Sequence, residues 1–189
     1  MLEAFSKLLK IKSPVHVPEI KLYSVVPQEQ IYPYEINEFN TMYGYPTWSG
    51  IALARFILDN PEKFNGLEIT DFGSGSGIAT IAAAMVGAKV TAIDQDVASL
   101  YFTQENCKLN NVSANFVWGT FRDIQTDHVM MSSLFYNTKN HQPIKDLISK
   151  KKVLIGGKLH DAFDELPGIR VNMPREAHVY SNYLEGGSS

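Results

Sequence analysis

The stretch from Ile69 to Asp94, ITDFGSGSGIATIAAAMVGAKVTAID, constrains the fold more than any other part of the sequence. A short apolar segment with an acid near its end precedes three alternating glycines, an alanine-rich segment and a β-branched segment. This order predicts a strand over 69–72, a tight turn, a helix over 78–86 that lies close to a sheet, and a second strand over 89–93. Such a unit directs backbone N–H groups toward a ligand beyond the carboxyl end of the first strand.

The spacing of the glycines narrows the class of ligand. The turn consists of Gly73, Ser74, Gly75, Ser76 and Gly77. Dinucleotide sites usually follow G-x-G-x-x-G, and here Ile78 stands where the third glycine of that pattern would fall. A pyrophosphate is therefore the less favoured ligand. Asp71 precedes the turn, where a carboxylate repels phosphate but receives an ammonium group, directly or through water.

A second acid, Asp94, ends the following strand about 20 residues beyond the glycines, where it is expected to bind both hydroxyls of a ribose. Its alternative role is helix capping. Gln95, the next residue, is assigned to the same cofactor site. The pattern acid-x-G-x-G-x-G with an acid after the next strand resembles the class I S-adenosylmethionine-dependent methyltransferases, which implies S-adenosylmethionine as the cofactor. The alternative is a glycine turn that only satisfies backbone geometry.

The remaining sequence predicts an α/β, Rossmann-like fold. We expect a seven-stranded, mostly parallel sheet with helices on both faces and a C-terminal antiparallel hairpin. Further strands are predicted at 114–118, 128–132, 153–155, 169–173 and 178–184, and helices at 51–59, 97–110, 141–150 and 161–166.

The chain is expected to have an N-terminal helix and extended arm over 1–46, a methyltransferase domain over 47–185 and a flexible tail over 186–189. The first 12 residues predict a surface helix, with organelle targeting as an alternative. Prolines at 14, 18, 27, 33 and 46 disfavour long helices in the arm. Tyr45 and Trp48 are predicted either to close over the methionine end of the cofactor or to pin the arm to the core.

Composition limits the classes of function. The 189 residues carry a formal net charge of -3, which gives no global reason to expect nucleic-acid binding, and no apolar run is long enough for a membrane span. A single cysteine, Cys107, excludes an internal disulfide and favours a reducing compartment, so a cytoplasmic location is expected. The five histidines show no metal-ligand spacing, and no metal is predicted.

A closer resemblance appears in five segments: LDNP, GIATIAAAMVGA, NCKLNN, FYN and VLIGG. Together they resemble the lysine methyltransferases of the electron-transfer flavoprotein β subunit, whose relatives modify ribosomal proteins. The resemblance implies a protein lysine as the methyl acceptor. It also places the reactive methyl near the end of the fourth strand, so Ser133, Tyr136 and Asn137 are the candidate catalytic residues, with Ser133 also beside the cofactor.

The sequence departs from that family where the acceptor binds. The family carries acids at the positions of Ser133 and Asn137, and an acid and a proline where Gly157 and Lys158 stand. Carboxylates attract and orient a lysine ammonium before it loses its proton. Here the Tyr136 ring could hold an amine by cation–π contact, with the Asn137 carbonyl as acceptor.

Two further cofactor residues are predicted after the third strand, where Thr120 and Phe121 could flank the adenine or only pack the loop.

Three functions stay open. They are a protein-lysine N-methyltransferase, a methyltransferase for a small molecule or another residue type, and a catalytically impaired relative that binds the cofactor or a partner. An amine methyltransferase for nucleic acids is disfavoured, because residues 133–136 are SLFY and not the Asn/Asp-Pro-Pro-Tyr signature.

Overall fold

The computed structural model describes residues 9–25, 44, 46–134, 137–157, 166–171, 173 and 177–184. Tyr45, Tyr136, the tail over 186–189 and most of the helix predicted over 161–166 lie outside these residues.

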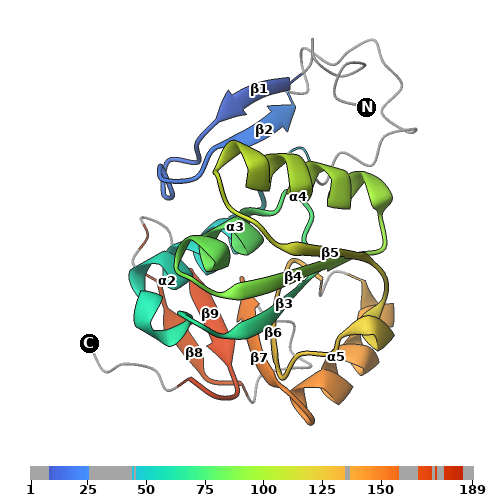
Figure 1. Ribbon diagram of the computed structural model, residues 1–189. Coiled ribbons are helices and arrows are strands. Elements are labelled where there is room, and N and C mark those ends of the chain that lie inside the picture. Colours follow the sequence, from blue (N-terminus) through green and yellow to red (C-terminus); the bar gives the residue numbers. More distant parts are fainter. Residues whose placement is uncertain are drawn as a thin grey trace.

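One seven-stranded sheet organises the molecule (Figure 1). Its strands are β3 (Glu68–Phe72), β4 (Lys89–Asp94), β5 (Asn115–Trp118), β6 (His128–Ser132), β7 (Lys152–Gly156), β8 (Gly168–Arg170) and β9 (His178–Ser181). The spatial order is β5-β4-β3-β6-β7-β9-β8. The five strands from β3 to β7 are parallel, and β9 pairs antiparallel with both β7 and β8. The predicted fold class is confirmed.

The order of the strands fixes where a ligand can bind. From β3 the chain continues through β4 to β5 on one side, and then returns to β6 and β7 on the other side. The connection that leaves β3 therefore runs to one side of the sheet, and the connection that leaves β6 runs to the other side. A crevice opens between them at the carboxyl ends of these two strands. The predicted glycine turn follows β3 at this point.

Helices cover both faces of the sheet (Figure 1). They are α2 (Trp48–Asp59), α3 (Ile78–Met85), α4 (Val97–Leu109) and α5 (His141–Ile148), with short 3-10 helices at Pro61–Lys63, Phe121–Asp123 and Thr138–Asn140. Successive residues of a strand point to opposite faces, so Met130 packs in the core that contains α2 and α3, whereas Met131 packs in the core that contains α5.

Helix α2 lies unusually close to the sheet. Its predicted apolar face, Leu53, Phe56 and Ile57, is buried as expected. A Cβ added to Gly156 of β7 would lie 2.4 Å from the carbonyl oxygen of Ser49. Only glycine permits this approach, which brings the first turn of α2 over the carboxyl ends of the strands.

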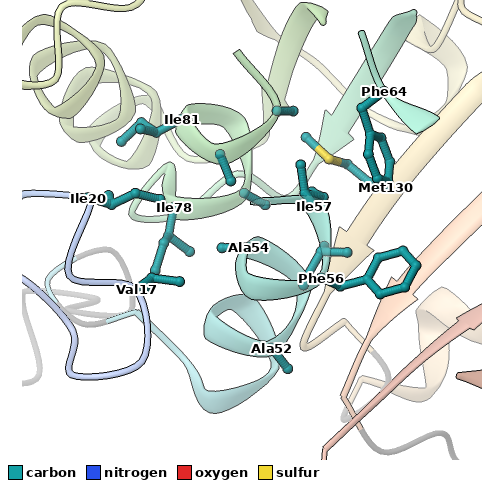
Figure 2. Close-up of a cluster of buried hydrophobic side chains, with 14 of the residues drawn as sticks. Val17, Ile20, Ala52, Ala54, Phe56, Ile57, Phe64, Ile78, Ile81 and Met130 are labelled. Atoms are coloured by element: carbon teal, nitrogen blue, oxygen red, sulfur yellow. The ribbon is translucent and has the colours of Figure 1, made fainter. Parts of the chain in front are cut away.

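The N-terminal segment differs from the prediction. Leu9–Lys12 forms strand β1, where a helix was expected, and pairs antiparallel with β2 (Leu22–Val25) in a separate two-stranded sheet. The loop between these strands buries Val17 and Ile20 beside Ile78 of α3 (Figure 2). Residues 9–25, the described stretch of the arm, therefore form a hairpin whose apolar loop residues pack in the main core.

Candidate functional site

The turn after β3 requires its glycines for two different reasons. Gly73, Gly75 and Gly77 have φ angles of +74°, +53° and +78°, a region that other residues enter only at a cost. A Cβ on Gly77 would lie 2.9 Å from Thr103 Cγ2, and one on Gly73 would lie 2.8 Å from Leu134 Cδ2. A Cβ on Gly75 would meet nothing closer than the Gly73 carbonyl oxygen at 3.9 Å. Gly73 and Gly77 therefore serve packing, whereas Gly75 leaves space for a ligand.

Asp71 is a buried carboxylate at the end of β3. Only 3% of the residue is exposed, and the Thr80 hydroxyl donates a hydrogen bond of 2.6 Å to its Oδ2. Burial raises the pKa of Asp71 to about 6, and the negative charge of Asp94 acts in the same direction. Within the described residues, no lysine, arginine or histidine forms an ion pair with it. The structure therefore holds a buried anion without a protein cation.

Asp94 is half-buried at the end of β4. Its Oδ2 accepts a hydrogen bond from the Gly75 amide at 3.0 Å, and its Oδ1 accepts one from the Asp96 amide at 3.0 Å. Burial raises the pKa of Asp94, and these backbone hydrogen bonds oppose that rise. The carboxylate has about four lone-pair sites, so it can still accept a hydrogen bond from a ligand hydroxyl.

These groups meet in one cavity of about 150 Å³ at the crevice. The predicted cofactor residues in its lining are Asp71, Gly73, Ser74, Gly75, Asp94 and Ser133. Gly77 contacts Thr103 at the base of the turn and does not line the cavity. The cavity thus combines the two predicted acids with the open side of Gly75, and a third acid, the α4 N-cap Asp96, also lines it.

On the β6 side of the glycine turn the cavity is lined by three hydroxyl groups, those of Thr47, Ser132 and Ser133. Ser133 follows β6 with a φ of +57°, an uncommon conformation for a residue with a side chain. Its Oγ donates to Thr47 Oγ1 at 2.9 Å. Thr47 is the N-cap of α2 and accepts a second hydrogen bond from the Gly50 amide at 3.1 Å. Ser132 also lines this wall, so the described part of it is neutral.

Two predicted residues lie away from the cavity. The Trp48 ring packs edge-on against His16, with centroids 5.3 Å apart, and lines a separate hollow beside the hairpin. Of the two roles predicted for Trp48, the structure shows the contact with the N-terminal arm. Asn137 is exposed, and its Oδ1 accepts from the Lys139 amide as the N-cap of a 3-10 helix. Local capping therefore directs the Asn137 side chain to its own backbone.

Three other predicted cofactor residues also lie outside the cavity lining: Gln95, and the two residues predicted to flank the adenine, Thr120 and Phe121. Gln95 is exposed, and its carbonyl accepts from the Trp118 indole. Thr120 forms a capping box with Asp123, and the Phe121 ring packs against Phe72 at 4.1 Å between centroids. For Thr120 and Phe121 the structure shows the loop packing that was the alternative prediction. Both border a different hollow near α5.

The sequence analysis missed several lining residues, among them Thr47, Ser99, Ser132 and Leu134. Thr47 could have been recognised as an N-cap, since it directly precedes the helix. Its contact with Ser133 could not, because the two residues are 86 positions apart and meet only when α2 crosses the end of β6.

Metal chemistry finds no support in the part of the chain that the structure describes, where no three histidine, cysteine or acidic residues gather as a metal site. None of the described helices has the length and apolar character to cross a membrane. The two carboxylates fit an adenosine joined to an amino acid, because the buried Asp71 can receive an ammonium group and the half-buried Asp94 can accept a hydrogen bond from a ribose hydroxyl.

Comparisons with known proteins agree with this geometry. The model of the ribosomal protein L11 methyltransferase family matches residues 51–144. The electron transfer flavoprotein β subunit lysine methyltransferase homolog of Caenorhabditis elegans is 32% identical over 142 residues, which cover 71% of this chain and 55% of that protein. The corresponding methyltransferase of Xenopus laevis is 30% identical over 163 residues, covering 74% and 63% respectively. The chain thus spans between about half and two thirds of these relatives.

A solved structure shows the same fold. The 16S rRNA N2 G1207 methyltransferase of T. thermophilus, solved with AdoMet and guanosine, aligns with a TM-score of 0.64 over 92% of this chain and 50% of that one, at 15% identity. Strand order, glycine turn, paired acids and sequence matches lead to one conclusion. In sequence the chain is similar to the ribosomal protein L11 and electron transfer flavoprotein β subunit methyltransferases, and it has the fold of an S-adenosylmethionine-dependent methyltransferase.

Proposed function

We propose that the protein binds S-adenosylmethionine and transfers its methyl group to the nitrogen of a protein lysine side chain. The observation that carries the cofactor assignment is Asp71, a buried carboxylate beside the open face of Gly75 that no cationic side chain in the described ranges pairs with. The names of the relatives support the acceptor, since they are lysine methyltransferases of a flavoprotein subunit.

Asp71, Gly75 and Asp94 form the charged wall of the cavity, and each of them has a binding role. Asp71 receives the ammonium of the amino-acid moiety, and its burial strengthens that attraction. Asp94 accepts hydrogen bonds from the ribose hydroxyls, and the Gly75 backbone allows close approach. When bound, the cofactor supplies an electrophilic methyl carbon on a cationic sulfur. The protein then needs to exclude water and align the acceptor, so no covalent enzyme intermediate is required.

Methyl transfer needs no reactant other than the cofactor and the lysine side chain. The neutral lysine nitrogen donates its lone pair to form the N–C bond while the C–S bond breaks and its electron pair stays on sulfur. The proton that the new secondary ammonium can lose goes to water. An ammonium has no lone pair and cannot attack, so the acceptor must lose its proton before the transfer.

A second candidate is a methyltransferase for a small molecule or another residue type. The observation that favours it is the neutral wall of Thr47, Ser132 and Ser133, since an uncharged nucleophile gains nothing from carboxylates. A third candidate is a catalytically impaired relative. It rests on Ser133 and Asn137, which stand where the resembling family carries acids.

Two measurements separate these functions. Calorimetry with S-adenosylmethionine and with NAD tests the cofactor, and we expect heat with the former only. Incubation with methyl-labelled cofactor and a cell extract tests catalysis. A labelled protein band whose acid hydrolysate contains methyllysine supports our proposal. Label in another residue or only in low-mass compounds supports the second candidate, and no label despite cofactor binding supports the third.

A further inference from the structure

The hydrogen bond between Thr47 and Ser133 fixes the orientation of both hydroxyls. Thr47 Oγ1 accepts from the Gly50 amide and from Ser133 Oγ, so both of its lone pairs are occupied. Ser133 donates its only hydroxyl proton in this hydrogen bond. The Ser133 oxygen can therefore meet a ligand only as a hydrogen-bond acceptor.

The backbone holds this arrangement in place. Ser133 has a left-handed φ of +57°, and such conformations persist where the surrounding structure determines them. Thr47 is fixed as the N-cap of α2, whose first turn packs against Gly156 and Gly157 of the sheet. Both side chains line the cavity on the β6 side of the glycine turn, whereas Asp94 lies on the β4 side.

We propose that Thr47 and Ser133 form a positioning pair for the methyl acceptor, in which Thr47 holds Ser133 Oγ as an acceptor for an N–H of the incoming amine. This inference rests on the proposed function and refines its acceptor side. It assigns the pair to a primary or secondary amine in its neutral form, because a hydroxyl oxygen orients an N–H without the charge that stabilises an ammonium. Thr47 acts through Ser133, and Ser133 contacts the substrate.

The test uses two ligands that differ at the transferable methyl, beside which the acceptor is expected. S-adenosylhomocysteine lacks the transferable methyl, and sinefungin carries an amino group in its place. Calorimetry gives the ratio of their affinities, which reports on the groups facing that position without requiring turnover. We expect Ser133→Ala and Thr47→Val to lower the preference for sinefungin about 5- to 10-fold, as the loss of one hydrogen bond predicts.

Matched variants separate positioning from stability. Thr126→Val removes a comparable hydroxyl pair, Thr126 with Thr70 at 2.8 Å, which lines a different hollow, and should leave the ratio unchanged. Thr47→Ser keeps the hydroxyl and should retain the wild-type ratio, which preserves the test if Thr47→Val does not fold.

The outcomes distinguish this inference from the proposed function. Normal binding of S-adenosylhomocysteine with an unchanged sinefungin ratio in Ser133→Ala overturns the positioning pair alone. Equal losses for both ligands also overturn it, because the pair would then serve the cofactor. Absence of binding of either ligand to the wild type overturns the cofactor assignment itself.

Discussion

The two walls of the cavity are built from different chemistry. Around Asp71, Gly75 and Asp94 the wall is charged, partly buried and held by backbone hydrogen bonds. On the β6 side Thr47, Ser132 and Ser133 present neutral hydroxyls. The charged wall follows the pattern of the glycine motif, whereas in the neutral wall Ser133 stands where the resembling family carries an acid. The two walls can therefore be tested separately, the charged wall by cofactor binding and the neutral wall by its effect on the acceptor.

The largest effect is expected within the glycine turn, where two neighbouring glycines have different roles. Gly77→Ala should lower the free energy of unfolding by about 2–4 kcal/mol, because the left-handed φ and the contact with Thr103 both oppose a Cβ. Gly75→Ala should cost only about 1 kcal/mol, since its Cβ meets open space. Urea denaturation of both variants measures the difference, and equal losses would contradict the division of roles.

Asp71→Asn should change binding and stability in opposite directions. Affinity for S-adenosylhomocysteine should fall by about 2–3 kcal/mol, because the ligand ammonium loses its counter-charge. The free energy of unfolding at pH 8 should rise by about 1–3 kcal/mol, because a buried carboxylate with a raised pKa destabilises the folded state when ionised.

The sign of this stability effect can be checked by pH. In the wild type the destabilisation is absent below the ordinary pKa of 3.8 and develops as pH rises through about 6. Calorimetry and denaturation at pH 5 and pH 8 therefore test both directions. If Asp71→Asn has a lower free energy of unfolding than the wild type at pH 8, the ionised Asp71 carboxylate stabilises the fold, contrary to this prediction.

Asp94→Ala should weaken S-adenosylhomocysteine binding by about 1–3 kcal/mol through loss of hydrogen bonds to the ribose. The amides of Gly75 and Asp96 lose an acceptor in the same variant, so its unfolding should be measured as a control. Affinity equal to the wild type would remove Asp94 from the cofactor site.

The smallest effect is expected from Trp48→Ala. Because the Trp48 ring packs against His16 and not into the cavity, cofactor affinity should change by less than about 0.5 kcal/mol. Calorimetry of this variant beside Asp94→Ala gives the comparison. A loss as large as that of Asp94→Ala would return Trp48 to the cofactor site.

Local patterns predicted the part of the fold that carries the charged wall. Strands β3 and β4 and helices α3 and α4 lie within one residue of their predicted bounds, because their apolar periodicity and glycine stops are local signals. The β1–β2 hairpin was missed. Its first strand, LKIK, is too short to show a period, and burial of Val17 and Ile20 depends on α3.

The neutral wall depended on tertiary contacts that no local pattern contains. Ser133 was predicted from its place after β6, yet its partner Thr47 comes from a helix far away in sequence. Asn137 was predicted for the same reason, but capping of the following 3-10 helix determines its orientation. Strand ends locate a site, while side-chain directions within it depend on neighbours brought by other elements.

The pH dependence of S-adenosylhomocysteine affinity tests the central claim most directly, because that claim joins a buried carboxylate to a ligand ammonium. From pH 8 to about 6 we expect constant affinity, and below the Asp71 pKa of about 6 a loss approaching 10-fold per pH unit as the carboxylate is protonated. Asp71→Asn should lack the step near pH 6. Affinity that stays constant from pH 8 to pH 5 in the wild type would contradict the account.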